Sequence, residues 1–416
     1  GSCSRIAARS ADPSMDVTAA STPSTPREEL RRRSAALQRH LAGAGIDAAL
    51  IAQNADLFYF TGSIQSGMLV VPAEGEPVYA VRRVIERARA DSALERIVPF
   101  ASLRGLATLV AEAAGRPVRR VGMELDVLPV AVRDRYAAAL GAADVSDVSA
   151  AVRRIRSVKS PYELERIRAA ARLSDAILRA ALATLHEGMT ELDLSAGIEA
   201  AARSAGHEGV VRLRAWNQET YYGVIAAGPA AAAPSFPDLP LGGLGPGPAA
   251  PYGAGWQRIA RGAPVIIDAP AVLGGYISDQ TRTLVIGRLP DALGRAHDAT
   301  MQILHAVAAA IRPGATPEAL YHLALDRAGS LGYAEAFMGA APYRVRYVGH
   351  GVGLELDEWP VLADGFTDPL EPGTVFAVEP KLIFPGTGVV GIEDEFAVTG
   401  EGCERLTVSE QRLFTV

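Results

Sequence analysis

The sequence predicts a two-domain protein of the α+β class, in which a small α/β domain precedes a larger domain of helices and β-hairpins. Over residues 27–150, short apolar runs alternate with helical segments, a pattern typical of α/β domains. Over residues 151–416, long helices instead bracket two apolar hairpins. A length of 416 residues, with 49% hydrophobic and 21% charged residues, is enough for two separate cores.

The N-terminal domain is expected to begin with an amphipathic helix over 28–44. Strand-like runs follow, one pair of which forms a hairpin that turns at Glu74-Gly75. The expected strands lie at 47–53, 57–62, 67–81 (the hairpin) and 121–124, and further helices lie at 82–91 and 127–140. Residues 1–26 stand apart: we interpret the segment before Met15 as a vector remnant and the Ser/Thr/Pro-rich stretch after it as a disordered lead.

The composition argues against several classes of partner. A net charge of -6 argues against binding to nucleic acid or to an anionic membrane, because both partners are negatively charged. No apolar run reaches the length of a membrane span. With the lead set aside, Cys403 is the single cysteine, which excludes an intramolecular disulfide and fits a reducing compartment. We therefore expect a cytoplasmic protein that binds neither nucleic acid nor membrane.

Three helices of the second domain carry clear start signals. Each combines a capping Ser or Thr with a first-turn proline or an acidic capping-box partner. They are found at Ser160-Pro161 with Glu163, at Thr190 with Asp193, and at Thr316-Pro317. Between these helices, residues 229–255 are so rich in proline and glycine that neither helix nor strand is expected, and we interpret this loop as a lid.

The first hairpin of the second domain is VIIDAPAVLGGYISDQTRTLVIG, with its turn at Leu273-Gly274-Gly275. Asp268 and Asp279 are equidistant from a midpoint between residues 273 and 274. They are therefore expected to face each other across the two strands.

The second hairpin is VFAVEPKLIFPGTGVVGIEDEFAV, which turns over residues 385–388. Glu379 and Glu393 are equidistant from Gly386 in this turn and form a second expected pair. Like charges placed opposite each other in apolar strands are destabilising, so the two pairs need a cation between them. Hard oxygen ligands suit manganese, cobalt, iron or zinc in a site for two divalent ions.

A fifth candidate ligand is His350, which lies among glycines in VGHGVGLELDEWP. Each candidate also has a structural interpretation. A lone histidine is usually a satisfied core or surface residue, and aspartates near turns commonly cap or face solvent. The metal site therefore depends on all five residues acting together.

With these motifs, the sequence resembles the pita-bread metallopeptidases: Xaa-Pro aminopeptidase, prolidase and methionine aminopeptidase, with creatinase as a metal-free relative. The resemblance runs from about residue 28 to the C-terminus and includes a creatinase-type N-terminal domain, the linker helix SVKSPYELERI and a pita-bread catalytic domain. It is carried by DAPAVLGGYISDQTRT, GHGVGLELDE, and VEP with GIED, which match all five ligand positions: Asp268, Asp279, His350, Glu379 and Glu393.

The resemblance implies a homodimeric hydrolase that cleaves Xaa-Pro peptides as a dipeptidase or aminopeptidase. It also implies two bound divalent ions, for which manganese is the preferred metal. In the mechanism that it implies, the two ions make a bridging water acidic and Glu379 takes its proton. The substrate would be a small peptide or a small amide.

The sequence departs from the family pattern around this ligand set. Histidines of the family are replaced by Asp357 and by Pro251, which is next to Tyr252, and an arginine and a tyrosine are replaced by Gly391 and Ile383. Lys381 replaces a glycine. These changes are also compatible with a non-peptidase enzyme that uses the same five metal ligands, such as a lyase or small-amide hydrolase of specialised metabolism. A catalytically silent binding module is a further alternative.

Several other residues receive roles on the same grounds. Asp357 is expected to bind an amine of the substrate during catalysis, the alternative being a solvated loop residue. Tyr252, Lys381 and Glu358 are expected to contact substrate, although Lys381 also fits a surface or rim charge. We expect Arg282 to pair structurally with a carboxylate. The aromatic residues Trp216, Tyr221 and Tyr222 fit a pocket lining, but more often such residues belong to the core.

Overall fold

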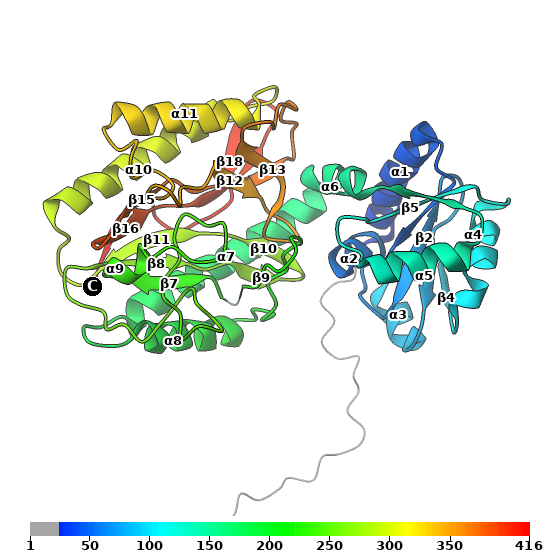
Figure 1. The fold of residues 1–416 in the computed structure, drawn as a ribbon, viewed down its shortest axis with the longest axis horizontal. Coiled ribbons are helices and arrows are strands. Elements are labelled where there is room, and N and C mark those ends of the chain that lie inside the picture. Colours follow the sequence, from blue (N-terminus) through cyan, green and yellow to red (C-terminus); the bar gives the residue numbers. More distant parts are fainter. Residues whose placement is uncertain (1–24, 221) are drawn as a thin grey trace, which may run out of the picture.

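The computed structural model describes residues 25–220 and 222–416 as two domains joined by helix α6 (Ser149–Ser157) (Figure 1). The proposed vector remnant, most of the expected lead and Tyr221 lie outside these residues. Within the described residues, no helix is both long enough and apolar enough to cross a membrane. Both domains have the predicted secondary-structure class: the first is α/β and the second is α+β.

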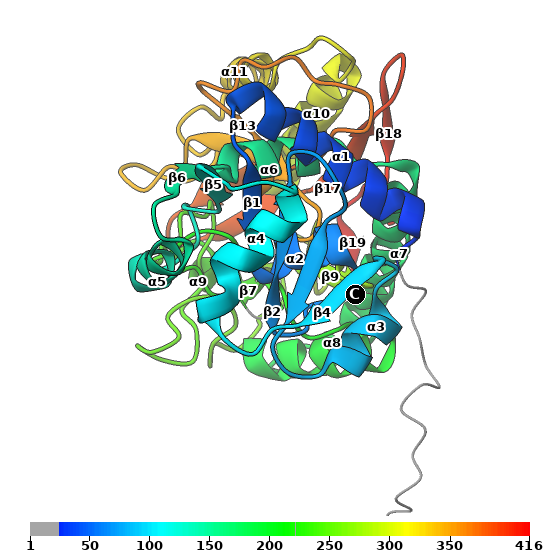
Figure 2. The same ribbon diagram turned by 90° about the vertical axis from the view of Figure 1, so that its right-hand side faces the viewer.

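The N-terminal domain is built on one sheet with the strand order β4-β3-β2-β1-β5-β6. Figure 2 looks onto this domain. The strands are β1 (Ala48–Ile51), β2 (Gly67–Pro72), β3 (Val78–Val81), β4 (Arg96–Pro99), β5 (Arg120–Met123) and β6 (Asp144–Asp147). The helices are α1 (Arg27–Ala44), α2 (Asn54–Thr61), α3 (Ile85–Asp91), α4 (Leu106–Ala114) and α5 (Val130–Leu140), with a short 3-10 turn at Leu103–Gly105.

Alternation of side chains along this sheet produces two cores. Ala49 and Ile51 of β1 pack with Leu37 and Leu41 of α1. Ala48 and Leu50 point the other way, toward a core that contains Leu106 of α4. Because successive strand residues face opposite sides, four consecutive buried residues require a cover on each face.

The predicted strand at 57–62 is wrong, because this segment forms helix α2. The Gln53 side chain accepts a hydrogen bond from Asp56 N at the start of the helix, and Gly62 ends it with φ 73°. Leu57 and Phe60 are buried in the helix, and a short apolar run of this kind also suits a buried strand, so the pattern did not distinguish helix from strand.

The C-terminal domain contains a four-stranded sheet with the order β19-β11-β8-β7, a five-stranded sheet with the order β13-β12-β14-β17-β18, and two short ribbons, β9-β10 and β15-β16. Their strands are β7 (Val224–Ala227), β8 (Pro264–Asp268), β9 (Ala271–Leu273), β10 (Tyr276–Ser278), β11 (Thr281–Val285), β12 (Tyr347–Gly351), β13 (Glu358–Ala363), β14 (Val375–Val378), β15 (Lys381–Phe384), β16 (Gly388–Gly391), β17 (Asp394–Val398), β18 (Cys403–Arg405) and β19 (Phe414–Thr415).

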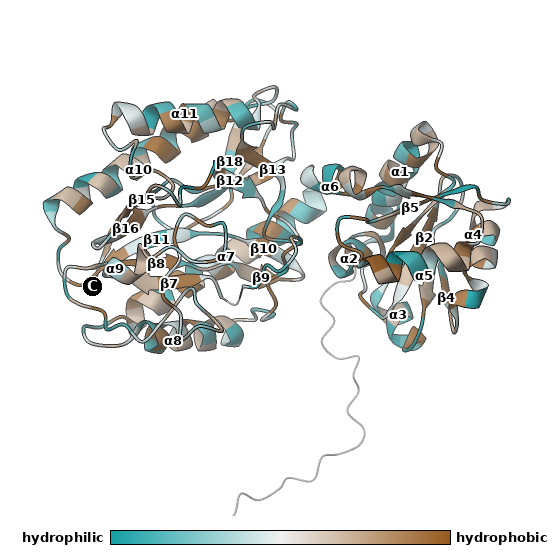
Figure 3. Cartoon of the chain, viewed as in Figure 1, coloured by the Kyte–Doolittle hydropathy of each residue, from teal (hydrophilic) through white to brown (hydrophobic). Residues whose placement is uncertain are grey.

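Two pairs of helices cover the strands on opposite sides (Figure 1). They are α7 (Pro161–Thr184) with α8 (Glu191–Ser204), and α10 (Asp291–Ala310) with α11 (Pro317–Ser330). The helical turn α9 (Gly228–Ala231) overlaps the start of the Pro/Gly-rich loop, where no helix was expected. The predicted capping boxes at Ser160 and Thr190 and the Thr316 cap are confirmed. In Figure 3 the strands β7 and β8 are coloured mainly hydrophobic, whereas the covering helices carry both hydrophobic and hydrophilic residues.

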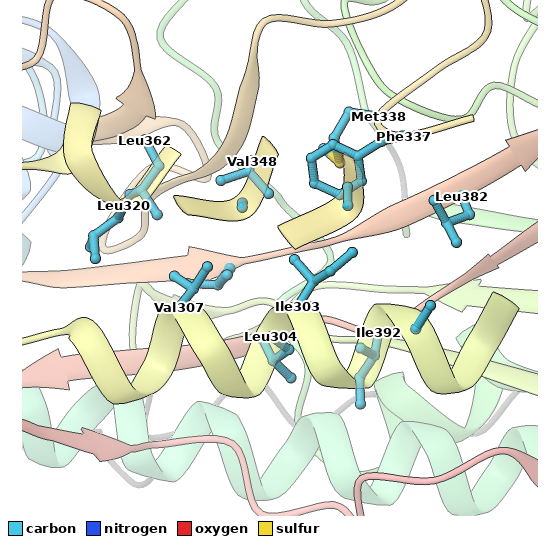
Figure 4. Packing of buried hydrophobic residues seen from close by; sticks show 14 of the residues in the cluster. Ile303, Leu304, Val307, Leu320, Phe337, Met338, Val348, Leu362, Leu382 and Ile392 are labelled. Carbon is cyan, nitrogen blue, oxygen red and sulfur yellow. The ribbon is translucent and has the colours of Figure 1, made fainter. Parts of the chain in front are cut away.

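The core beneath α10 fixes the second hairpin. Ile303 and Leu304 of α10 pack in one cluster with Leu382 of β15 and Ile392, which follows β16 (Figure 4). All four side chains are fully buried. Leu382 and Ile392 thus face the helix, whereas the alternate positions, which include Lys381, point to the other side of the hairpin.

A buried network of charges joins the two domains. Arg156 of α6 binds Asp56 of the N-terminal domain at 2.5 Å and Glu358 of the C-terminal domain at 2.5 Å. Lys159 Nζ lies 3.0 Å from the other oxygen of Glu358. Burial raises the pKa of Glu358, but Arg156 and Lys159 outweigh this effect and lower the pKa to about 2. Glu358 is therefore a carboxylate held between two cations.

We expect Glu358→Gln to lower the free energy of unfolding at pH 7 by roughly 3–5 kcal/mol, because it takes the carboxylate away from the buried ammonium of Lys159 and removes one of the carboxylates bound to Arg156. The wild-type carboxylate, with its depressed pKa, stabilises the fold above its ordinary pKa of 4.5, and this contribution is lost as the pH falls toward about 2. The difference in urea midpoint between variant and wild type should therefore shrink between pH 5 and pH 2. Glu335→Gln, at a side chain that is 95% exposed, is the control. An unchanged midpoint for Glu358→Gln at pH 7 would contradict the network.

Candidate metal centre

The five predicted ligands converge in the C-terminal domain from separate strands. Asp268 ends β8, and Asp279 lies between β10 and β11. His350 belongs to β12, whereas Glu379 follows β14 and Glu393 precedes β17. His350 Nε2 lies 3.6 Å from Glu379 Oε1, 3.8 Å from Asp279 Oδ2 and 3.9 Å from Glu393 Oε1. The structure thus brings the imidazole and these carboxylates together.

The register of the second hairpin agrees with the sequence prediction. Val378 pairs with Asp394 on one side of the two glutamates, and Lys381 pairs with Gly391 on the other. The same register on both sides sets Glu379 opposite Glu393. Two buried carboxylates therefore face each other, as expected.

The predicted register of the first hairpin is wrong by two residues. Leu273 pairs with Tyr276, and Asp268 pairs with Thr281 and not with Asp279. Gly274 and Gly275 have φ of 62° and 79°, so these two glycines alone make the turn and Leu273 belongs to the strand. Asp268 and Asp279 are therefore diagonal neighbours rather than a directly opposed pair.

Lys381 projects into the middle of the carboxylates. Its side chain is 1% exposed, and its Nζ lies 3.1 Å from Asp268 Oδ2 and 3.3 Å from Glu393 Oε2. Nζ also donates a short hydrogen bond to Glu379 Oε2. The interpretation of Lys381 as a surface or rim charge is wrong, and three carboxylate partners leave this ammonium no free N–H for a substrate. Burial lowers the pKa of Lys381, but the three carboxylates outweigh it and raise the pKa well above its usual value.

Gly391 provides the space for this lysine. A Cβ atom at position 391 would lie 2.7 Å from Lys381 Cγ, closer than such atoms can approach. The backbone of Gly391 is fixed from the other side, because its N–H donates to Thr283 Oγ1 at 3.0 Å and its carbonyl accepts from the same hydroxyl at 2.8 Å. The residues at positions 381 and 391 are therefore coupled, because the glycine leaves the space that the lysine side chain occupies.

The residues on the His350 side fit a divalent cation. One ligand atom from each of Asp279, His350 and Glu393 lies within 4.8 Å of the others. Glu393 Oε1 is buried and has no hydrogen-bond partner among the described residues, as expected of an oxygen that awaits a cation. Burial, followed by repulsion from Glu393 and Asp268, raises the pKa of Asp279 well above its usual value. On the Asp268 side, the ammonium of Lys381 fills the space between the carboxylates, so these residues do not fit a second ion.

The other predicted site residues have defined contacts. Asp357 Oδ1 accepts a hydrogen bond from Arg214 N at 3.0 Å, and the Tyr252 hydroxyl donates to Thr220 Oγ1 at 2.6 Å. Glu358 is bound by Arg156 and Lys159 at the domain junction. Its carboxylate therefore belongs to the ion-pair network between the domains and not to the cluster of predicted metal ligands. Catalytic and substrate roles for Asp357 and Tyr252 stay predictions.

Arg282 has the structural role expected of it. It binds Asp394 at 2.7 Å and donates to the carbonyl of Glu393 at 2.7 Å, which fixes the strand that carries Glu393. The interpretation of Trp216 as a core residue is wrong, because it is 87% exposed. Tyr222 is half-buried and packs on His207 at a ring distance of 4.8 Å.

The Pro/Gly-rich loop lies against the hairpin that carries Lys381. Leu241 and Tyr252 of the loop pack with Ile383 and Val389 in one apolar cluster. The hydroxyl of Tyr347, three residues before His350, donates to the carbonyl of Asp238 at 3.0 Å. No sequence pattern indicated this hydrogen bond, because a lone tyrosine in a strand is usually a core residue. The lid interpretation stays a prediction.

Comparisons with known proteins agree with this arrangement. Residues 165–400 match the model of metallopeptidase family M24, and residues 33–158 match the creatinase/prolidase N-terminal domain. A Xaa-Pro dipeptidase of Pyrococcus horikoshii is 27% identical over 370 residues, which cover 88% of this chain and 94% of the relative. An uncharacterised peptidase of Bacillus subtilis is 28% identical, over 90% of this chain and 98% of that protein.

Solved structures show the same two-domain fold. A Xaa-Pro dipeptidase of Bacillus anthracis superposes with a TM-score of 0.79 at 26% identity and covers 93% of this chain and 100% of that one. A dipeptidase of Mycobacterium ulcerans gives 0.78 at 27% identity, over 95% and 100% of the two chains. The predicted pita-bread fold with a creatinase-type N-terminal domain is confirmed. The chain belongs to metallopeptidase family M24 and is a metallopeptidase-like hydrolase.

Proposed function

We propose that this protein is a metal-dependent hydrolase that cleaves the amide bond of small peptides of the Xaa-Pro type or of a related small amide. The observation that carries the proposal is the convergence of His350 with Asp279, Glu379 and Glu393 on the fold of family M24. Asp279, His350 and Glu393 would hold the cation, with manganese as the first choice. The ion would supply a lower pKa for a bound water and a polarised carbonyl.

Glu379 and Lys381, beside this cation site, have separate roles in the reaction. Glu379 Oε2 accepts from Lys381, which leaves Oε1, on the His350 side, to take a proton from the attacking water. The water oxygen bonds to the carbonyl carbon, the C–N bond breaks, and Glu379 returns the proton to the leaving nitrogen. Lys381 keeps the glutamate in position throughout, because its ammonium is bound to Asp268 and Glu393 as well.

A second candidate is an enzyme that acts on a non-peptide substrate with the same cage. It is favoured by Asp357, Pro251, Ile383 and Gly391, which stand where the resemblance gives His, His, Tyr and Arg. Loss of two imidazoles removes hydrogen-bond donors that can each contribute about 3 kcal/mol to an oxyanion transition state. Xaa-Pro cleavage by this chain is therefore expected to be slow.

We further propose that the protein is a cytoplasmic homodimer. The half-buried thiol Cys403 is free, which supports a reducing compartment. The dimer follows from the resemblance, in which the N-terminal domain of one subunit closes the site of its neighbour.

The first test is metal-dependent release of amino acids from Xaa-Pro dipeptides and tripeptides. We expect slow hydrolysis with Mn²⁺ or Co²⁺ that stops after chelation and returns when metal is added. His350→Ala should weaken metal binding by about 100-fold or more, since even changes to residues behind the ligands cost 10–100-fold. His40→Ala, at an exposed histidine of the N-terminal domain, is the control. A folded, metal-loaded protein that releases no amino acid from any peptide favours the non-peptide enzyme.

The second test concerns Asp357. If this residue merely lacks a donor that a peptidase needs, Asp357→His should raise Xaa-Pro cleavage by about tenfold or more. Asp357→Asn, which keeps an acceptor for Arg214 N but not the charge, controls for loss of the carboxylate. The readout is kcat/KM for a single dipeptide at saturating metal. No gain with histidine would indicate that Asp357 serves a different substrate.

A further inference from the structure

The ammonium of Lys381 stands where a second metal ion would have to bind. Its Nζ lies 3.1 Å from Asp268 Oδ2 and 3.3 Å from Glu393 Oε2, and it also bonds to Glu379 Oε2. A metal ion held by these oxygens would lie about 2.0–2.2 Å from each. An ion and the ammonium therefore cannot occupy the same space.

The hairpin is adapted to this lysine. Lys381 and Gly391 are direct partners in the β15-β16 ladder, and a Cβ at position 391 would collide with Lys381 Cγ. The backbone at Gly391 cannot retreat, because both its N–H and its carbonyl are bonded to Thr283. The lysine stem thus follows one fixed route into the cage, between a side-chain-free strand and the carboxylates.

Formal charge also favours one ion. Four carboxylates and one ammonium leave a net charge of -3 in a buried site, which is costly unless cations are added. One divalent ion on the His350 side reduces this to -1. Of the two sides of this carboxylate cluster, this is the one where Glu393 Oε1 has no hydrogen-bond partner in the part of the chain that the structure describes.

The choice of lysine is itself informative. The sequence contains 41 Lys and Arg residues, of which only Lys159 and Lys381 are lysines. Both are buried and ion-paired. A lysine ammonium is a compact point charge with three N–H donors, whereas a guanidinium is broad and planar. Three oxygens arranged around one centre suit the ammonium.

We propose that Lys381 replaces one ion of a two-metal site, so that this protein binds a single divalent cation between Asp279, His350 and Glu393. Lys381 then acts as a positioning residue that holds Asp268, Glu379 and Glu393 in place of the missing ion. The inference deepens the proposed function, since it concerns the same cage.

The test is the number of manganese ions bound per chain. We expect equilibrium dialysis with elemental analysis to give one Mn²⁺ for the wild type, with the electron paramagnetic resonance spectrum of an isolated ion. Lys381→Gly should bind two, with a spin-coupled spectrum, because ions about 3.5–4 Å apart interact. The matched control is Lys159→Met, at the other buried lysine, which should lower stability but keep one ion per chain.

Lys381→Gly removes an ammonium that three of the carboxylates share, and it needs a second form in case it does not fold. Lys381→Gly with Gly391→Arg restores a positive charge at the neighbouring position and should also bind two ions. Circular dichroism before metal addition establishes which variant is folded. Two ions in the wild type, one ion in every folded variant without Lys381, or no ion in the wild type would each overturn the inference.

Peptide cleavage separates this inference from the proposed function. A wild type that binds one ion and cleaves no peptide leaves the role of Lys381 intact while the peptidase proposal fails. A wild type that cleaves Xaa-Pro peptides with two bound ions keeps the peptidase proposal and refutes the role of Lys381.

Discussion

Neutralisation of buried carboxylates is the constraint on which the C-terminal domain depends. The strands that carry Glu379 and Glu393 are apolar and covered by α10, so their acidic side chains can stay charged only beside cations. The chain supplies one cation itself, through Lys381. On the opposite side, Glu393 Oε1 has no hydrogen-bond partner within residues 25–220 and 222–416. The same need explains why Gly391 lacks a side chain, since that space belongs to the lysine stem.

Much of this arrangement could be predicted from local rules. Helix starts with a capping box at Ser160 and Thr190 appear as expected, and the symmetry of the second hairpin correctly placed Glu379 opposite Glu393. The same symmetry also pairs Lys381 with Gly391, so the sequence contained the signal for their contact. Lysine is usually exposed, and this general tendency concealed the signal.

Other features depend on choices that the sequence pattern does not determine. In the first hairpin the run Leu273-Gly274-Gly275 allows a turn of two or of three residues, and each choice shifts the partner of Asp268. The short apolar run at 57–62 fits a helix as well as a strand, and the cap from Gln53 decided for the helix. The domain-joining network requires Asp56, Arg156 and Glu358, which are far apart in sequence and meet only in the folded chain.

The same network of ion pairs extends to Asp357, for which a role toward the substrate is predicted. Arg214 binds Asp56 at 2.8 Å and Asp126 at 2.7 Å, both in the N-terminal domain, while its backbone N–H holds Asp357. The orientation of Asp357 is set by an arginine that is anchored in the other domain. A substitution at Asp357 is therefore expected to be coupled to the domain junction, because any residue introduced there meets a backbone that ion pairs with Asp56 and Asp126 keep in place.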